Sequence, residues 1–197
     1  MKTLCMDTAH KDLIVSLLKE DRVVSFYQEN AWKRQSERIL PVIDELVKEA
    51  GWNPQELQQI VITKGPGSYT GVRIAMTIAK ILATRLNIPL YTLSTLQLYA
   101  GLGHCYVALD ARGKRVYCAL YKDGKSIIPD TIMTIEDFLS TRDYSVPIIG
   151  DGNTLGFEDN YPDLRNSFLD LKEFWSEVKE PHLLSPEYLK DNEAYKV

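Results

Sequence analysis

The chain has 197 residues, of which 45% are hydrophobic and 25% are charged, and its net charge is −4. This is the composition of an ordinary globular protein, and the length suits one domain or two of about 100 residues each. The small negative charge argues against a large basic surface for nucleic acid. The basic clusters Lys33-Arg34 and Arg112-Lys114-Arg115 are therefore interpreted as solvated surface charge.

Cysteine usage and the N-terminus favour a cytoplasmic protein. Cys5, Cys105 and Cys118 form no CxxC pair, and each lies in an apolar run, where a free cysteine behaves as a small hydrophobic residue. The N-terminus reaches Asp7 too early for a signal peptide, and no apolar run of about 18 residues predicts a membrane span. We expect no contact with a membrane.

The first half of the chain reads as strands followed by alternating helices and strands, which indicates an α/β sheet with an antiparallel edge. Pro41 lies inside the first helical pattern and should kink or break it. The expected strands are residues 3–7, 13–18, 22–27, 58–63 and 88–93, and the expected helices are residues 32–50, 71–86 and 94–102.

The chain then begins the same pattern again. Residues 6–24 and 109–127 align without a gap at a constant offset of 103, which places Asp7 on Asp110. Chance can produce similar hairpins, but the ungapped register favours duplication. A helix is expected at 134–140 and a strand at 146–150, ahead of a poorly patterned tail.

We therefore expect two domains, residues 1–102 and a smaller one at 103–197, whose last residues may pack back on the first. Two halves that each open with a three-stranded meander and an Asp after the first strand favour the actin-like ATPase superfold, also called ASKHA or RNase H-like, with mixed sheets. In that fold the first turns approach phosphate and magnesium. Here His10 and Lys11 stand where small residues are wanted, so an ordinary hairpin turn is the better interpretation.

The segment ITKGPGSYTGVR, residues 62–73, joins a strand to a helix. It does not end as a Walker loop, and its spacing is neither that of the dinucleotide fingerprint nor that of a nucleophile elbow. Two alternatives stay open, an anion site at the helix N-terminus and a structural turn whose glycines fix the helix against the sheet. The candidate residues are Gly65, Pro66, Gly67, Ser68, Tyr69, Thr70, Gly71 and Arg73.

The chain resembles the bacterial TsaB family, also called YeaZ, in the segments GPGSYTGVR, NIPLYTLSTL, QSERILPVIDELVKEAG and PEYLK. The resemblance covers nearly the whole chain and is strongest from residue 33 to 96. Gln35 replaces a frequent histidine, Tyr69 a frequent phenylalanine and Lys190 an arginine, and these departures are mild. The family's members are the non-catalytic partners in making threonylcarbamoyladenosine on tRNA.

The related family TsaD is catalytic, and it carries His-x-x-x-His, which puts two imidazoles on one helical face for a metal. The corresponding places here are Thr95 and Tyr99, which are poor ligands for a divalent metal. The histidines, His10, His104 and His182, are isolated and are interpreted as surface or packing residues. We therefore expect no catalytic residue and no metal ligand.

The helix expected at 71–86 has an apolar arc of roughly 220°, about twice what one sheet face needs. Either the helices of the first half cover each other, or the arc is an exposed patch that marks an interface. The resemblance implies the second, since family members pair through these helices as homodimers or with TsaD. The expected interface residues are Ile39, Ile43, Leu46, Ile74, Ile78 and Ile81.

The resemblance implies a scaffold that binds and positions TsaD, with the ATPase TsaE joining, while TsaD transfers a threonylcarbamoyl group to the tRNA adenosine just after the anticodon. The tRNA would be reached through the complex. The chain itself would need no cofactor, and ATP or ADP would bind at the interface of the assembled complex if at all. The alternative is an actin-fold small-molecule kinase or ATPase, which the His10-Lys11 turn and the reduced second half disfavour.

Overall fold

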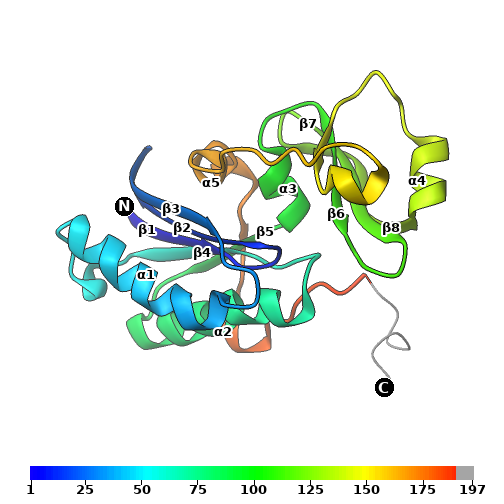
Figure 1. Ribbon diagram of the computed structural model, residues 1–197. Coiled ribbons are helices and arrows are strands. Elements are labelled where there is room, and N and C mark those ends of the chain that lie inside the picture. The colour runs from blue at the N-terminus through cyan, green and yellow to red at the C-terminus, as the bar shows by residue number, and fades with distance from the viewer. Residues whose placement is uncertain (190–197) are drawn as a thin grey trace.

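Two mixed β-sheets organise the chain (Figure 1). The computed structural model describes residues 1–189. Its strands are β1 Lys2–Asp7, β2 Asp12–Lys19, β3 Arg22–Asn30, β4 Gln59–Thr63, β5 Leu90–Leu93, β6 Cys105–Asp110, β7 Arg115–Lys122, β8 Lys125–Thr134, β9 Ile148–Gly150 and β10 Ser176–Glu177. The first sheet has the order β10-β5-β4-β1-β2-β3, and the second has the order β8-β7-β6-β9. β4 pairs in parallel with β1 and β5, β9 pairs in parallel with β6, and the remaining neighbours are antiparallel.

The second sheet repeats the first at the offset seen in the sequence. β1 and β6 both begin and end 103 residues apart, and so do β2 and β7. Each half opens with an antiparallel meander, β1-β2-β3 or β6-β7-β8. On the free side of its first strand, each meander is joined by a parallel strand: β4 pairs with β1, and β9 pairs with β6. The prediction of an α/β fold with two mixed sheets is confirmed.

Helices cover the sheets in layers. In Figure 1, α1 and α2 lie on one face of the first sheet, α3 lies between the two sheets, and α4 covers the outer face of the second. The α-helices are α1 Gln35–Glu49, α2 Tyr69–Leu86, α3 Thr95–Ala100, α4 Ile135–Thr141 and α5 Ser167–Asp170. The 3₁₀-helices are η1 Pro54–Glu56, η2 Gly152–Leu155, η3 Lys172–Phe174 and η4 Pro181–Leu183.

Helix boundaries differ from the sequence-based expectation at two places. α1 begins at Gln35 and continues through Pro41, so the expected break is wrong. Pro41 is exposed and removes a single helix hydrogen bond, whereas the buried face of α1 packs on the first sheet. α2 begins at Tyr69 rather than Gly71, because the Ser68 side chain accepts a hydrogen bond from the Gly71 amide and caps the helix.

Three hydrophobic clusters follow these layers, and the middle one joins the halves. It combines Cys5, Ile14 and Val61 of the first sheet with Val107 and Tyr117 of the second. The two halves therefore share part of one core. The three cysteines are buried, as expected, and burial raises the pKa of Cys105 to about 11 and that of Cys118 to about 12.

The poorly patterned tail returns to the first half. β10 pairs with β5 at the edge of the first sheet. Beyond η4, the Glu187 amide donates to the Lys64 carbonyl at 2.8 Å, and the Lys80 ammonium donates to the Leu184 carbonyl at 2.9 Å. Among the described residues, no helix combines the length and apolarity that crossing a bilayer requires.

Candidate functional site

The first turn, residues 8–11, links β1 and β2 at the boundary between the halves. Asp7 is fully buried, and its Oδ1 accepts hydrogen bonds from the Ala9 amide at 3.0 Å and from the Thr63 hydroxyl. Burial raises the pKa of Asp7, although these hydrogen bonds act in the opposite direction. The Thr8 hydroxyl donates to the Gly71 carbonyl at 2.6 Å, which ties the turn to the start of α2.

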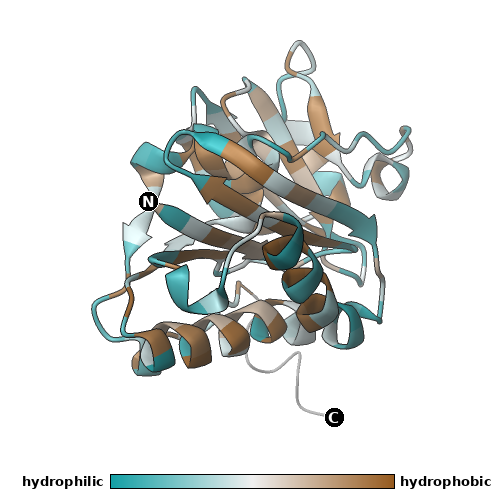
Figure 2. Cartoon of the chain, turned by 90° about the vertical axis from the view of Figure 1, so that its left-hand side faces the viewer, coloured by the Kyte–Doolittle hydropathy of each residue, from teal (hydrophilic) through white to brown (hydrophobic). Residues whose placement is uncertain are grey.

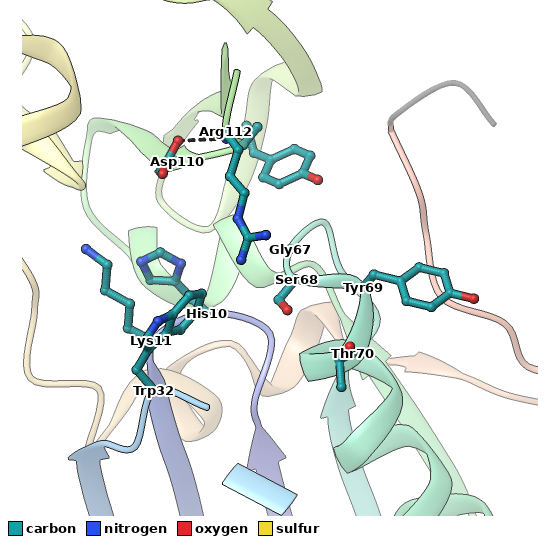
Figure 3. Close-up of a pocket in the computed structure, with 11 residues that line it drawn as sticks. His10, Lys11, Trp32, Gly67, Ser68, Tyr69, Thr70, Asp110 and Arg112 are labelled. Carbon is teal, nitrogen blue, oxygen red and sulfur yellow. Dashed lines mark hydrogen bonds between the residues drawn. The ribbon is translucent and has the colours of Figure 1, made fainter. Parts of the chain in front are cut away.

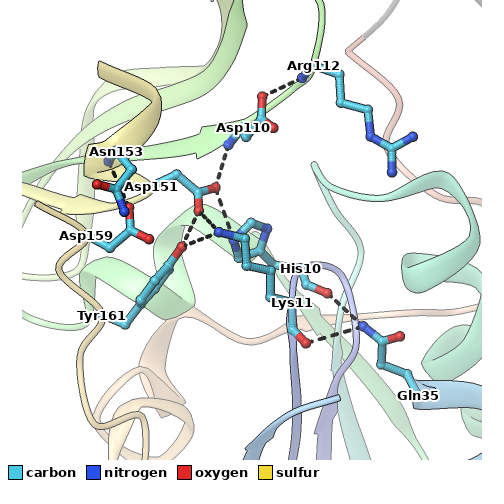
Figure 4. A network of polar contacts seen from close by, with 9 residues as sticks. All are labelled: His10, Lys11, Gln35, Asp110, Arg112, Asp151, Asn153, Asp159 and Tyr161. Carbon is cyan, nitrogen blue, oxygen red and sulfur yellow. Dashed lines mark hydrogen bonds and ion pairs between the residues drawn. The ribbon is translucent and has the colours of Figure 1, made fainter. Parts of the chain in front are cut away.

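A buried carboxylate, Asp151, holds this turn against the second half (Figure 4). Its Oδ1 accepts from the Lys11 ammonium at 2.6 Å and from the Tyr161 hydroxyl. Its Oδ2 accepts from the Asp110 amide at 2.7 Å and lies 3.1 Å from His10 Nε2. Residues from the first turn, from β6 and from the tail therefore converge on one side chain, which we call the Asp151 clasp.

The clasp keeps Asp151 ionised. Burial by itself would raise the pKa of Asp151, but the contact with His10 and the hydrogen bonds from the Asp110 amide and Lys11 outweigh burial and lower the pKa below its usual range. The same carboxylate raises the pKa of Lys11 against the opposing effect of that lysine's own burial. The pair thus remains a charged pair near neutral pH.

The loop of residues 64–71 packs directly on the first turn. The Ser68 amide donates to the Ala9 carbonyl at 2.7 Å. A Cβ at Gly67 would overlap the Ala9 carbonyl oxygen, and one at Gly71 would overlap that of Thr8. Gly65 has a φ of +108°, in the region that favours glycine. Gly67 and Gly71 are therefore required by close backbone approach and not by a positive φ.

A cavity of about 220 Å³ opens where the first turn, the loop and the β6–β7 turn meet (Figure 3). We call it the cleft cavity. His10, Lys11 and Trp32 line it from the first half, and Asp110 and Arg112 line it from the second. Figure 3 shows the Arg112 side chain reaching toward the loop at Gly67 and Ser68. The first turn is thus part of a cavity wall between the halves, which its interpretation as an ordinary hairpin turn did not anticipate.

The outer surface of the helix layer carries exposed apolar side chains. Figure 2 shows hydrophobic positions along the helices beneath the first sheet. On α2, Ile81 is 62% exposed, and Ile74 and Ile78 are half-buried. On α1, Leu40 is 57% exposed. We call Leu40, Ile74, Ile78 and Ile81 the helix-layer patch.

Part of the expected interface lies inside the molecule. Ile39, Ile43 and Leu46 are buried in the cluster between α1 and the first sheet. Their expected position on the surface is wrong, because α1 turns this face toward the sheet. Leu40, which was not among the expected residues, is the large apolar side chain that α1 exposes. That Ile74, Ile78 and Ile81 contact a partner stays a prediction.

Comparison with known proteins places the chain in a family. The family model described as TsaD, tRNA N6-adenosine threonylcarbamoyltransferase, matches residues 26–151. The tRNA threonylcarbamoyladenosine biosynthesis protein TsaB of Bacillus subtilis (strain 168) is 37% identical over 167 residues, which cover 79% of this chain and 73% of that protein. The chain belongs to the TsaB family. A TsaB protein of Buchnera aphidicola subsp. Schizaphis graminum is 28% identical over 92% of this chain and 97% of its own length.

The fold agrees with solved structures of this family. YeaZ from Pseudomonas aeruginosa superposes with a TM-score of 0.74 at 23% identity, covering 95% of this chain and 99% of that chain. A second structure, of a protein with similarity to peptidase YEAZ from Pseudomonas aeruginosa, gives a TM-score of 0.76 at 25% identity, covering 96% of this chain and 99% of that chain.

The two positions that the resemblance assigns to the metal ligands of TsaD lie in the core of this TsaB-family chain. Thr95 and Tyr99 are buried on α3, and burial raises the pKa of the Tyr99 phenol well above its usual value. A buried neutral phenol and a hydroxyl are weak ligands for a divalent metal. Within residues 1–189, no three His, Cys, Asp or Glu side chains gather as a metal site would require.

Of the two interpretations of the histidines, surface or packing, His10 fits packing. It is 7% exposed, it contacts Asp151, and its ring meets that of Tyr99 edge to face at 6.1 Å between centroids. His182 is exposed beside Glu180, as expected of a surface residue. Gln35 of α1 donates from its side-chain amide to the His10 carbonyl at 2.9 Å and so holds the first turn.

Sequence reasoning missed Asp151 and Tyr161. Asp151 follows β9, which is parallel to β6, so the two strands end at the same edge of the second sheet. Polar residues at the carboxyl ends of parallel strands commonly meet, so the position of Asp151 after the expected strand at 146–150 was the signal that could have identified it. Tyr161 lies in an irregular segment, and no local pattern places its hydroxyl on the clasp.

Proposed function

We propose that the chain is a non-catalytic subunit in the biosynthesis of threonylcarbamoyladenosine on tRNA, and that it binds and positions the catalytic protein TsaD. Membership of the TsaB family supports the process, since the relatives named above carry it in their names. The observation that carries the binding role is the helix-layer patch, in which Ile81 is 62% and Leu40 is 57% exposed. Exposed apolar side chains that gather on one face are typical of protein–protein contacts.

The chemistry of the cleft supports a non-catalytic role. The Lys11 ammonium is engaged by Asp151 and Tyr161, and the Asp7 carboxylate is enclosed by Thr63 and Ala9. The charge of Lys11 is thus neutralised by Asp151, and Asp7 is fully buried, which argues against both as ligands of a reacting phosphate or its metal. The alternative, a small-molecule kinase or ATPase of the same fold, requires those groups to face a ligand.

The remaining partners follow from the same proposal. A second copy of the chain would use the helix-layer patch in the absence of TsaD, and the ATPase TsaE would join the assembled complex. The tRNA would be bound through that complex, in which ATP or ADP would occupy an interface site rather than the cleft of this chain.

The test is an Ile81→Glu variant mixed with TsaD from the same organism. An unpaired glutamate buried at an interface costs several kcal/mol, which is enough to abolish a micromolar complex. Ile81 is exposed in the monomer, so the variant should fold normally. We expect light scattering to show a folded chain that no longer pairs with TsaD or with itself, and the reconstituted tRNA modification to be lost.

The matched control is Ile127→Glu, the same substitution at an isoleucine that is 57% exposed on β8 of the second sheet. This control should retain pairing and modification. Normal pairing by Ile81→Glu would show that the partner binds elsewhere. ATP turnover by the isolated chain would instead favour the kinase alternative.

A further inference from the structure

A second cavity, of about 250 Å³, lies beside the cleft cavity, where α1 and α2 begin. We call it the helix-end cavity. It shares Trp32, Ser68, Thr70 and Arg112 with the cleft cavity, and it extends past them to Lys33 and Ser36. Two polar cavities therefore adjoin, but their charges differ.

The ionisable side chains that line the helix-end cavity are both cationic. Lys33 comes from the segment before α1, and Arg112 comes from the β6–β7 turn of the other half. Within residues 1–189, neither cation has a carboxylate oxygen within the 4.0 Å of an ion pair. The side-chain contact of Arg112 is with the Trp32 ring, at 5.8 Å from guanidinium to centroid. In the cleft cavity, by contrast, Lys11 is neutralised by Asp151, and Asp110 adds a carboxylate.

The backbone adds to this positive potential. α1 has 15 residues and α2 has 18, and the first turn of each reaches the cavity. Arg34, the N-cap of α1, provides no side-chain acceptor for that helix, and the Glu37 amide donates to the Arg34 carbonyl at 3.1 Å. The Gln35 and Ser36 amides therefore remain available as donors. The Ser36 and Thr70 hydroxyls line the same wall and can also donate.

We propose that the helix-end cavity binds the phosphate group of a small phosphorylated ligand, held between Lys33 and Arg112. Two unpaired cations from different halves fit the charge of a phosphate, and the arginine fork matches its oxygens. The exposed Trp32 ring beside Arg112 offers a flat surface to the organic part of the ligand. The volume suits a small compound rather than a large cofactor.

The proposal is tested on the full chain by calorimetric titration with inorganic phosphate, with AMP and with adenosine. We expect saturable binding of phosphate and AMP and none of adenosine, which has the same base and sugar but no phosphate. Arg112→Gln and Lys33→Gln should each weaken AMP binding about tenfold, because each removes one charge-assisted contact to phosphate. Both residues are exposed, so both variants should fold.

Lys125→Gln is the matched control, since it removes an exposed positive charge from β8 of the second sheet, and it should bind AMP as the wild type does. The absence of saturable phosphate and AMP binding would overturn the proposal, and so would AMP binding that neither Arg112→Gln nor Lys33→Gln weakens. Binding of an RNA stem-loop without any response to phosphate or AMP would also overturn it, because the ligand would then be a polymer. These titrations need no partner protein, so their failure is distinct from failure of the proposed TsaD contact.

Discussion

Replacing Asp151 by asparagine should destabilise the protein substantially, because the substitution keeps the side chain's shape and removes its charge. The carboxylate is 1% exposed and accepts three hydrogen bonds, from Lys11, Tyr161 and the Asp110 amide, beside its contact with His10. An asparagine has one acceptor oxygen, so its amide group must face a donor. The variant leaves the Lys11 ammonium half-buried without its counter-charge.

The magnitude follows from these contacts. Breaking a buried ion pair by removing one partner costs about 3–5 kcal/mol. The Lys11 side chain is 35% exposed and regains water, so we take the lower end, about 3 kcal/mol. For a chain of this length each kcal/mol lowers the melting temperature by about 2–4 °C, so the melting temperature should fall by about 6–12 °C.

The assay is chemical unfolding of the isolated chain, with Asp163→Asn as the control. Asp163 is exposed and accepts a hydrogen bond from the nearby Arg165 amide, so its replacement should change the free energy of unfolding by less than about 0.5 kcal/mol. Equal unfolding midpoints for Asp151→Asn and Asp163→Asn would refute the clasp as a stabilising link. A double-mutant cycle with Lys11→Met should give a coupling energy of about 1–2 kcal/mol, and additive effects would show that Lys11 and Asp151 do not interact.

The pH dependence supplies an independent check. The folded pKa of Asp151 lies below its unfolded value of 3.8, so the stabilisation is fully present above that value and is lost as the pH falls through the folded pKa. The stability difference between the wild type and Asp151→Asn should therefore be constant near neutral pH and shrink below about pH 4. A difference that persists unchanged in acid would show that the charge is not the cause.

Three further predictions follow from the site. The wild type should gain stability relative to Asp7→Asn as the pH falls from neutral toward 4, because burial raises the folded pKa of Asp7. This trend is the reverse of that expected for Asp151. A stability difference that does not change with pH in denaturant titrations would contradict it. Gly67→Val should lower the free energy of unfolding by about 1–3 kcal/mol, because the Cβ of the valine would overlap the Ala9 carbonyl oxygen. A variant that melts like the wild type would show that Gly67 is not needed for the packing of the loop on the first turn. Elemental analysis of the purified chain should find no stoichiometric zinc or iron, since Thr95 and Tyr99 stand where the resemblance places the metal ligands of TsaD. About one metal per chain would overturn the non-catalytic proposal.

The sequence by itself determined the local elements and the duplication. The strand patterns at residues 3–7 and 13–18 predict β1 and β2 closely, and the 103-residue offset predicts the bounds of β6 and β7. These features could be read because the alternation of apolar residues and the turn signals are local properties of the chain. The glycines of the 64–71 loop were also identified as structural candidates. For Gly67 and Gly71 the reason is a tertiary one, the close approach of Ala9 and Thr8.

Only the tertiary structure decided which apolar residues face solvent and which polar residues meet. The broad apolar arcs of α1 and α2 did not reveal that Ile39 packs on the sheet while Leu40 and Ile81 face outward, because that choice depends on how each helix is rotated against its neighbours. The Asp151 clasp joins residues 140 positions apart in the chain, Lys11 and Asp151. No local pattern encodes such a contact, since it exists only once the two sheets have packed against each other.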